Sequence, residues 1–289
     1  MMPHPAPAGA GPVTGRLAAA PRAAHGAAEP GTPGAAELGT AEATAVFRAC
    51  LTALAHPGRL AALPQTGPPQ TARHPVLLPV LALADLMVSV AAVDSAGRDD
   101  AEATAELARV TGARPAEPAA ARIVLAGGEG APDDGVAAAL LGRVHPGTPE
   151  APHHGALIVL AVAGLRACGP DEAPAQVAVQ APAEAQAPGT AAEEVWELTG
   201  PGVDGAARVA VMGPGEGFRA ARAAVTAGFP TGVDVLCVAP GGTLLGLPRT
   251  TALAPVRAGA PAAPAPSAAA DAPEPAPTTG EESAWATQE

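Results

Sequence analysis

The apolar run at residues 156–163, ALIVLAVA, limits most strongly what this chain of 289 residues can fold into. A strand with one face in water alternates apolar and polar side chains, and this run does not alternate. Continuous apolar strands are typical of sheets that are covered on both faces. The run therefore predicts a buried strand with other layers on both sides.

Further segments indicate the elements that surround this strand. Residues 86–93 and 122–126 have the pattern of buried strands, and residues 101–110, 136–141 and 217–227 have that of helices. Two hairpins are predicted, with strands at 195–199 and 207–211 and at 233–239 and 244–247. Alternating helices and buried strands favour an α/β domain, a layered mixed β-sheet with helices on its faces.

The first helix is predicted to begin near Thr40, whose hydroxyl can cap it, and to end at His56-Pro57-Gly58. An apolar stripe at helical spacing is expected to face the core. It consists of Val46, Phe47, Cys50, Leu51 and Leu54.

Residues 76–93 are apolar over almost the length of a membrane span, but Pro79, Asp85 and Ser89 interrupt them. A charge in mid-membrane costs about 2.5–3.5 kcal/mol, so this segment is interpreted as a buried helix followed by a strand. The first 26 residues contain no hydrophobic run. We therefore expect no membrane association and a cytoplasmic location.

The ends of the chain differ in composition from its middle. Residues 1–39 and 258–289 are rich in Ala and Pro and lack apolar periodicity, so both are predicted to be disordered tails. A similar piece at 169–192 is predicted to be a mobile loop. The remaining 40–257 are predicted to form a single domain.

Composition excludes several functions. All 16 basic side chains are Arg, and without Lys the chain cannot form a Schiff base with pyridoxal phosphate or a phosphate loop of the G-x-x-x-x-G-K type. The net charge of −12, with scattered Arg, argues against nucleic acid. Three distant cysteines argue against a disulfide framework or a zinc ribbon.

Two patterns suggest ligands but are better explained by structure. Gly200, Gly202 and Gly205 match the dinucleotide pattern G-x-G-x-x-G, yet a strand, not a helix, is predicted to follow, so a hairpin turn is favoured. His153 and His154 lie near His145 and Glu150 in a Pro-rich stretch, without the spacing of a known metal site. We expect solvated imidazoles there.

Arg249 has two possible roles. With Thr250 and Thr251 it could bind phosphonate or phosphate oxygens through a forked, charged hydrogen bond. The favoured interpretation is an Arg that fixes the end of the chain or a contact with a partner. Arg59 has the same two interpretations. Cys50 and Cys237 lie in apolar patterns and are expected to be inert.

Several segments, in order over residues 42–253, resemble one family: PhnH, the H component of the bacterial carbon–phosphorus lyase system. They are Val46–Arg48 with Leu54–Arg59, Leu81–Asp85, Thr111–Ala113, Gly147–Glu150, Leu198–Gly202, Phe229–Asp234 and Leu247–Thr251. Within them, the positions that could contact an anion or a partner are Pro57, Gly58, Arg59, Gly200, Gly202, Pro230, Asp234, Pro248, Arg249, Thr250 and Thr251.

The resemblance implies a domain similar to a minimal pyridoxal-phosphate transferase that binds no cofactor, and no catalytic or metal-binding residue is expected. It implies a subunit without its own active site, which assembles with the G, I and J subunits of the system, with the L subunit associated. That machinery forms ribose 1-methylphosphonate 5-triphosphate from ATP and methylphosphonate. The isolated chain is expected to be a homodimer. The alternatives are a stand-alone binding protein or enzyme for a small phosphorylated ligand, and a degenerate paralogue that has lost its partners.

Overall fold

A computed structural model describes residues 38–64, 74–128, 130–169 and 192–256. All of these residues belong to one compact unit, Ala35–Glu289. The tails expected at 1–39 and 258–289 and the loop expected at 169–192 lie almost wholly outside the described residues. Within the described ranges, every helix is too short or too polar to span a bilayer.

The main sheet has seven strands in the order β1-β10-β9-β5-β4-β2-β3. The strands β2, β3, β4, β5 and β9 are mutually parallel, and β10 is antiparallel to both of its neighbours. The bounds are β1 Ala61–Ala62, β2 Ser89–Val93, β3 Arg114–Pro115, β4 Ile123–Ala126, β5 Leu157–Ala161, β9 Asp234–Val238 and β10 Thr243–Leu247. The α/β class and the buried central strand are thus confirmed.

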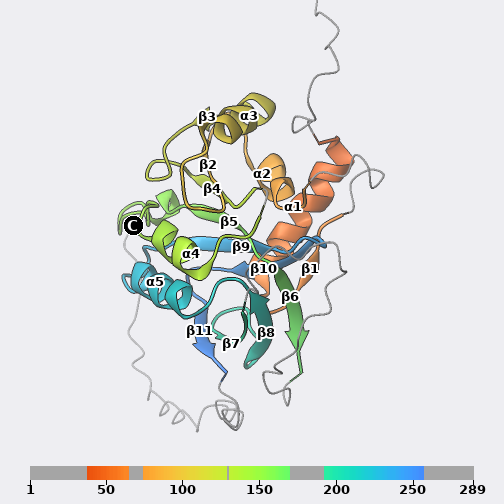
Figure 1. The fold of residues 1–289 in the computed structure, drawn as a ribbon, viewed down its shortest axis with the longest axis vertical. Coiled ribbons are helices and arrows are strands. Elements are labelled where there is room, and N and C mark those ends of the chain that lie inside the picture. The colour runs from red at the N-terminus through yellow and green to blue at the C-terminus, as the bar shows by residue number, and fades with distance from the viewer. Residues whose placement is uncertain (1–37, 65–73, 129, 170–191, 257–289) are drawn as a thin grey trace, which may run out of the picture. The chain divides into compact units, whose positions relative to one another are not determined.

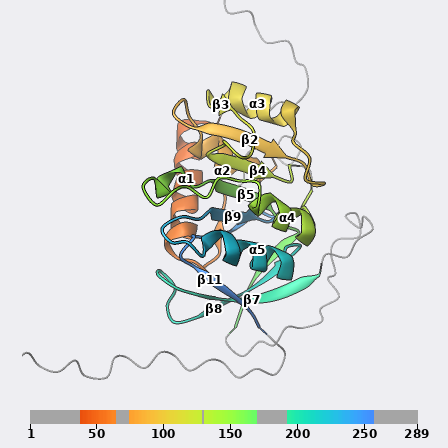
Figure 2. The same ribbon diagram turned by 90° about the vertical axis from the view of Figure 1, so that its left-hand side faces the viewer.

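A second, antiparallel sheet of four strands was not predicted from the sequence. Its order is β11-β7-β8-β6, with β6 Gly164–Cys168, β7 Glu193–Thr199, β8 Ala207–Met212 and β11 Ala252–Pro255. The hairpin β7–β8 and the hairpin β9–β10 were both predicted, but β11 follows the second one and joins the small sheet. Figures 1 and 2 show the small sheet at the opposite end of the domain from α3.

Helices cover the two faces of the main sheet. One face packs against α1 Thr40–Ala55, α2 Leu77–Leu83 and α3 Ala101–Thr111. The other packs against α4 Asp134–Leu141, α5 Glu216–Thr226 and one face of the small sheet. A single-turn helix, Pro152–His154, precedes β5. Side chains along β2 alternate between these two cores, so all five of its residues are buried.

The start and the apolar stripe of α1 differ from the prediction. Gly39 occupies the cap position and Thr40 is the first helical residue, so no side chain caps this end. Ala53 is buried in the core, whereas Phe47 is 42% and Leu51 50% exposed. The reason is close packing on β10: a Cβ at Gly246 would lie 2.3 Å from the carbonyl oxygen of Ala53. At this short separation the small side chain faces the sheet and the large ones face outward.

Other boundaries shift by a few residues. The strand predicted from Leu86 begins at Ser89, because Asp85 forms a turn in which its carboxylate accepts the N–H of Met87 at 2.7 Å. The end of α1 at His56 and the helix before β2 were predicted correctly. Asp100 and Asp133 cap α3 and α4 by accepting backbone N–H groups of the first turn.

Candidate functional site

The guanidinium of Arg249 joins several segments at the amino ends of the parallel strands. Because β10 is antiparallel to β9, its end brings Arg249 beside Asp234 at the start of β9. Nη2 and Nε of Arg249 donate to the two carboxylate oxygens of Asp234 at 2.7 and 3.3 Å. Nη1 donates to the carbonyl oxygens of Pro152 at 2.7 Å and Pro230 at 3.3 Å. Each guanidinium nitrogen thus has a partner inside the chain, and four of its five N–H donors are used in these bonds, the fifth being an N–H of Nη2.

Arg122, just before β4, lies close to this group. Its Nη1 donates to the carbonyl oxygen of Gly155 at 2.7 Å. Burial, and then the charge of Arg249, lowers the pKa of Arg122, while Asp234 acts in the opposite direction. A Cβ at Gly155 would lie 2.3 Å from the carbonyl oxygen of Gly232, so the loops before β5 and β9 touch through glycine. The charged side chains at this end of the sheet are therefore hydrogen-bonded to the loops around them.

Arg222 on α5 bonds the loop after β10, which contains Arg249. It was not singled out from the sequence. It is 2% exposed and donates to the carbonyl oxygens of Thr251 at 2.7 Å, Leu247 at 3.3 Å and Pro248. Burial lowers the pKa of Arg222 to about 10, against the opposing influence of Cys237 and Asp234. Arg222 Nε and Thr251 Oγ1 are buried without a partner in the described part of the chain.

Three glycines of the sequence motifs, Gly58, Gly200 and Gly202, lie where segments of the chain pack closely against one another. A Cβ at Gly58 would lie 2.3 Å from the Cβ of Ala207, and one at Gly202 would lie 2.5 Å from the carbonyl oxygen of Ala55. A Cβ at Gly200 would lie 2.7 Å from the carbonyl oxygen of Thr250. All three motif glycines have positive φ angles, so a side chain there would meet both a clash and backbone strain. The turn after α1, the β7–β8 hairpin and the loop after β10 are thus packed directly together.

Two predicted anion ligands take no part in this group. Arg59 is exposed, and its guanidinium forms no ion pair within the described ranges. Thr250 is exposed, whereas Thr251 and Pro57 are buried. The structure therefore unites Pro230, Asp234, Pro248 and Arg249 around internal contacts and does not bring Arg59 or the Thr250 hydroxyl to an open anion site.

The other sequence patterns occupy structural positions. The glycine pattern at 200–205 leads into strand β8, so it is the hairpin turn that was favoured. His145, Glu150, His153 and His154 are exposed, and no group of metal-ligating side chains occurs among the residues that the structure describes.

Cys50 and Cys237 are both buried. Burial raises the pKa of each thiol to about 12, so neither is ionised near neutral pH. Cys237 lies beside Arg222, whose charge lowers its pKa without offsetting the effect of burial. Both positions agree with inert packing.

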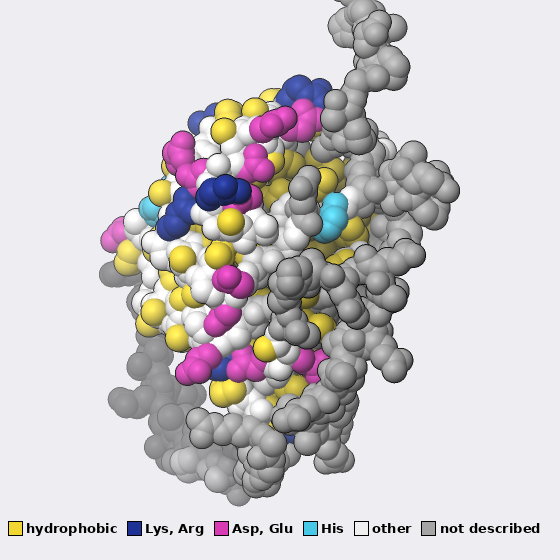
Figure 3. Space-filling view, in the orientation of Figure 1, with side chains coloured by type: hydrophobic (Ala, Val, Ile, Leu, Met, Phe, Trp, Pro, Cys, Tyr) yellow, Lys and Arg dark blue, Asp and Glu magenta, His cyan; other side chains and the backbone are white. Residues whose placement is uncertain are grey.

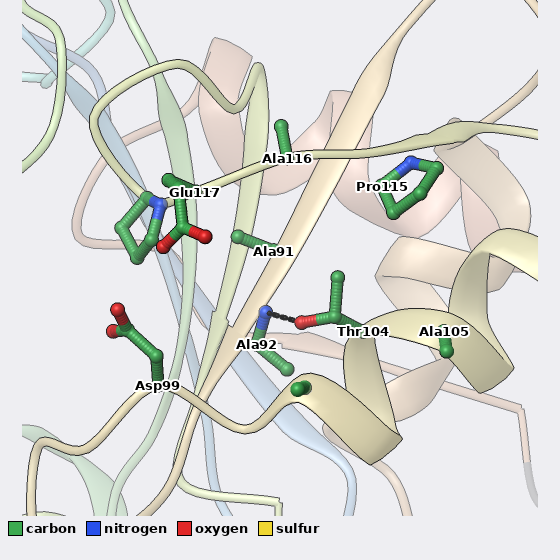
Figure 4. Close-up of a pocket in the computed structure, with 10 residues that line it drawn as sticks. Ala91, Ala92, Asp99, Thr104, Ala105, Pro115, Ala116 and Glu117 are labelled. Atoms are coloured by element: carbon green, nitrogen blue, oxygen red, sulfur yellow. Dashed lines mark hydrogen bonds between the residues drawn. The ribbon is translucent and has the colours of Figure 1, made fainter.

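A cavity of about 390 Å³ lies beside the carboxyl half of β2, where the short strand β3 ends. Its lining is mostly Ala and Pro with Thr104, and its charged side chains are Asp99 and Glu117. Figure 4 shows both carboxyl groups on the left-hand side of the view. The Thr104 hydroxyl is occupied, since it accepts the N–H of Ala92 and donates to the carbonyl oxygen of Asp100.

The whole carboxyl end of this part of the sheet is acidic. In α/β sheets, ligands bind outside the carboxyl ends of the strands, at the point where strand order reverses. Here that point lies at β2, which has β3 on one side and β4 on the other. The loops after these three strands contain the acids Asp94, Asp99, Asp100, Glu117, Asp133 and Asp134 and the base Arg98 among their described residues. Figure 3 shows acidic side chains in several places on the face that it presents. Two of these acids are paired with Arg side chains, Asp94 with Arg98 and Asp99 with Arg143, which follows α4, so the cations at this rim are already engaged.

Comparison with known proteins gives the family. A search of curated proteins found no match. A family model described as bacterial phosphonate metabolism protein (PhnH) matches residues 37–254, about three quarters of the chain. The matched region contains the five α-helices of the described residues and both sheets apart from Pro255, the last residue of β11. This chain therefore belongs to the PhnH family of bacterial phosphonate metabolism proteins.

Proposed function

We propose that this chain is the H component of a carbon–phosphorus lyase core complex and has no active site of its own. In this proposal it works with the G, I and L subunits in forming ribose 1-methylphosphonate 5-triphosphate from ATP and methylphosphonate. It assembles with the G, I and J subunits in the cytoplasm, uses no cofactor, and forms a homodimer when isolated. Membership of a phosphonate metabolism family supports the pathway.

The observation that carries the non-catalytic role is the occupation of Arg249. The pathway's substrates are anions, and a charged, forked hydrogen bond from Arg249 to such a substrate would need a guanidinium edge that is free of internal partners. Arg249 instead forms five hydrogen bonds within the chain, four of them from its guanidinium. The usual ligand position of an α/β sheet has two carboxylates, Asp99 and Glu117, and no cationic side chain in its lining, and the nearby Arg143 is already paired with Asp99. Both features support a role in assembly.

The proposed pull-down uses an untagged chain co-expressed with a tagged I subunit and with the G and J subunits from the same source. We expect the chain to co-purify in fixed stoichiometry, and a deletion strain to lose growth on methylphosphonate as sole phosphorus source. Absence from the purified complex would contradict the proposed role.

The stand-alone alternative is tested by calorimetry. Isolated chain titrated with ATP or methylphosphonate is expected to give no binding heat up to millimolar ligand. Binding at micromolar concentration that is lost in Arg249→Lys would favour the alternative function, because Lys keeps the charge but cannot form the fork.

A further inference from the structure

The cavity of about 390 Å³ beside the carboxyl half of β2 has no part in the proposed assembly role. Its volume falls in the range of about 300–1,000 Å³ that is usual for sites of small organic ligands. Seven of its ten lining residues are Ala or Pro, whose short side chains leave the space open. It also lies where the strand order reverses, which is the usual ligand position of an α/β sheet. Size and position therefore fit a small organic molecule.

The walls of the cavity are fixed by hydrogen bonds within the chain. On the side of α3, the Thr104 hydroxyl accepts the N–H of Ala92 at 2.8 Å. The carbonyl oxygen of Ala92 accepts the N–H of Asp100 at 2.9 Å. Where β3 ends, Ala116 donates its N–H to the carbonyl oxygen of Val90 at 2.9 Å. The cavity is therefore formed before any ligand binds, which removes part of the entropy cost of association.

The same hydrogen bonds restrict the kind of molecule that the cavity can hold. An extended peptide that adds to a sheet needs free main-chain groups on the edge of the neighbouring strand. On this side of β2, both main-chain groups of Ala92 and the carbonyl oxygen of Val90 are already bonded. An anion at the amino end of α3 would meet the carboxylate of Asp100, which accepts the N–H of Ala103 there at 2.9 Å. A peptide strand and an anion are therefore both unsuitable ligands.

The lining has an acidic end and an apolar end. Figure 4 shows the carboxyl groups of Asp99 and Glu117 on the left-hand side of the view and Pro115 and Ala105 on the right. Asp99 is paired with Arg143, whereas the carboxylate of Glu117 forms no ion pair or hydrogen bond within the described residues. A free carboxylate beside an apolar space favours a cation that carries an apolar body. We propose that this cavity binds a small organic amine, with its ammonium group at Glu117 and its apolar body against Pro115 and Ala105.

The test compares three probes with the same phenyl body by isothermal titration calorimetry of the full chain. Phenethylammonium carries a positive head, phenethyl alcohol a neutral one, and 3-phenylpropionate a negative one. The amine should bind about 5-fold more tightly than the alcohol, which is the size expected of an ion pair with the exposed carboxylate of Glu117. The carboxylate probe should give no binding heat at millimolar concentration, because it meets Glu117 with a like charge.

Two variants of the lining and one control locate the site. Glu117→Gln should remove the preference for the amine and leave the affinity for the alcohol unchanged. Ala105→Leu should weaken both probes by about 10-fold, since the larger side chain occupies the apolar end. Ala105 is exposed on α3 and Leu is a good helix former, so this variant should keep the wild-type fold. Glu102→Gln is the matched control, because Glu102 lies in the first turn of α3 but outside the lining, and its affinity for the amine should stay at the wild-type value.

Three outcomes would overturn the proposal. The first is that the wild-type chain does not bind the amine at millimolar concentration. The second is an equal loss of amine binding in Glu117→Gln and Glu102→Gln, which would mean that the negative charge of the whole chain attracts the amine. The third is amine binding that Ala105→Leu leaves unchanged, which would place the amine outside the cavity. None of these results bears on assembly with the other subunits, so the proposed function is tested separately.

Discussion

The seven-stranded sheet and the four-stranded sheet are stabilised by different kinds of contact. The main sheet is buried on both faces by apolar side chains from five helices and from the small sheet itself. The small sheet has one apolar face and three charged pairs: Glu197–Arg208 and Glu193–Arg166 join its strands, and Glu194–Arg219 joins β7 to α5. Apolar packing spreads the free energy of stabilisation over many residues, whereas polar contacts concentrate it in a few.

The small sheet is attached to the rest of the domain by its apolar face and, in addition, by polar contacts of α5. Arg222 bonds the loop that leads from β10 into β11. Asp134, at the start of α4, accepts the backbone N–H groups of Gly215, Gly217 and Phe218 at 2.7–2.8 Å, and so occupies the amino end of α5. Single substitutions should therefore act very differently in the two sheets, and four predictions test this.

The largest effect is expected for Leu236→Ala in the centre of the main sheet. Leu236 is fully buried on β9, and truncation leaves a cavity among apolar neighbours. The free energy of unfolding should fall by about 4 kcal/mol, with no dependence on salt concentration. Urea denaturation at low and high salt measures both quantities. Leu51→Ala, on the outer side of α1, is the control, with an expected loss below about 0.5 kcal/mol. Equal losses at both positions would contradict the packing argument.

Arg222→Ala should come next, with a loss of about 3 kcal/mol, because it leaves three carbonyl oxygens of the 247–251 loop without their buried donor. Hydrogen exchange should show that β11 and β7 lose protection while β5 keeps it. Arg109→Ala is the control, since Arg109 forms an exposed ion pair with Glu106 and such pairs contribute at most about 1 kcal/mol. Uniform loss of protection across both sheets would mean that the small sheet is not attached as proposed.

Asp134→Asn is expected to cost about 2 kcal/mol, comparable to loss of a strong helix cap. Burial alone would raise the pKa of Asp134, but bonds from Phe218, Gly215 and Gly217 and the charge of Arg219 outweigh it, so the pKa lies below its ordinary value. A lowered pKa means that the unfolded chain binds the proton more readily.

The contribution of Asp134 is therefore complete at neutral pH and is lost as the pH falls below about 4, the ordinary Asp range. Thermal melts of the wild type and Asp134→Asn from pH 7 to pH 3 should draw closer together toward the acidic end. Asp133→Asn, which changes the neighbouring cap of α4, is the matched control and should leave the amino end of α5 protected. Curves that remain parallel down to pH 3 would exclude this linkage.

These differences explain which parts were predictable from the sequence. The runs at 122–126, 156–163 and 233–239 form β4, β5 and β9, because a strand covered on both faces needs an unbroken apolar sequence. The small sheet was harder to predict. Its strand β6, Gly-Leu-Arg-Ala-Cys, is short and half exposed, and it pairs with β8 about 40 residues further along the chain. Its pairing depends on tertiary contacts that no local pattern encodes.

The candidate site also has one part that was predicted from the sequence and one that was not. Arg249 was singled out by its motif, and the structure gives it partners from Asp234, Pro152 and Pro230 that lie far apart in sequence. Arg222 was missed, although one signal was present: it falls on the apolar stripe of α5 with Phe218 and Val225, at i, i+4 and i+7. A charge in an apolar stripe indicates a buried polar contact, but its partners cannot be read from the sequence.

The smallest effect is expected for the cross-strand pair Glu197–Arg208, directly opposite in the β7–β8 register. The Nη2–Oε2 distance is 3.1 Å, and the side chains are 19% and 10% exposed, respectively. A double-mutant cycle with Glu197→Gln and Arg208→Gln should give a coupling energy of about 0.5–1 kcal/mol. Only a minor part of it should vanish in 1 M salt, because a partly buried pair is screened much less than an exposed one. A coupling near zero at both ionic strengths would mean that the charged pair does not help to hold β7 to β8. The polar contacts that distinguish the two sheets would then be those of Arg222 and Asp134 alone. A coupling above 2 kcal/mol would instead make this pair a principal support of the small sheet, equal to the attachments of α5.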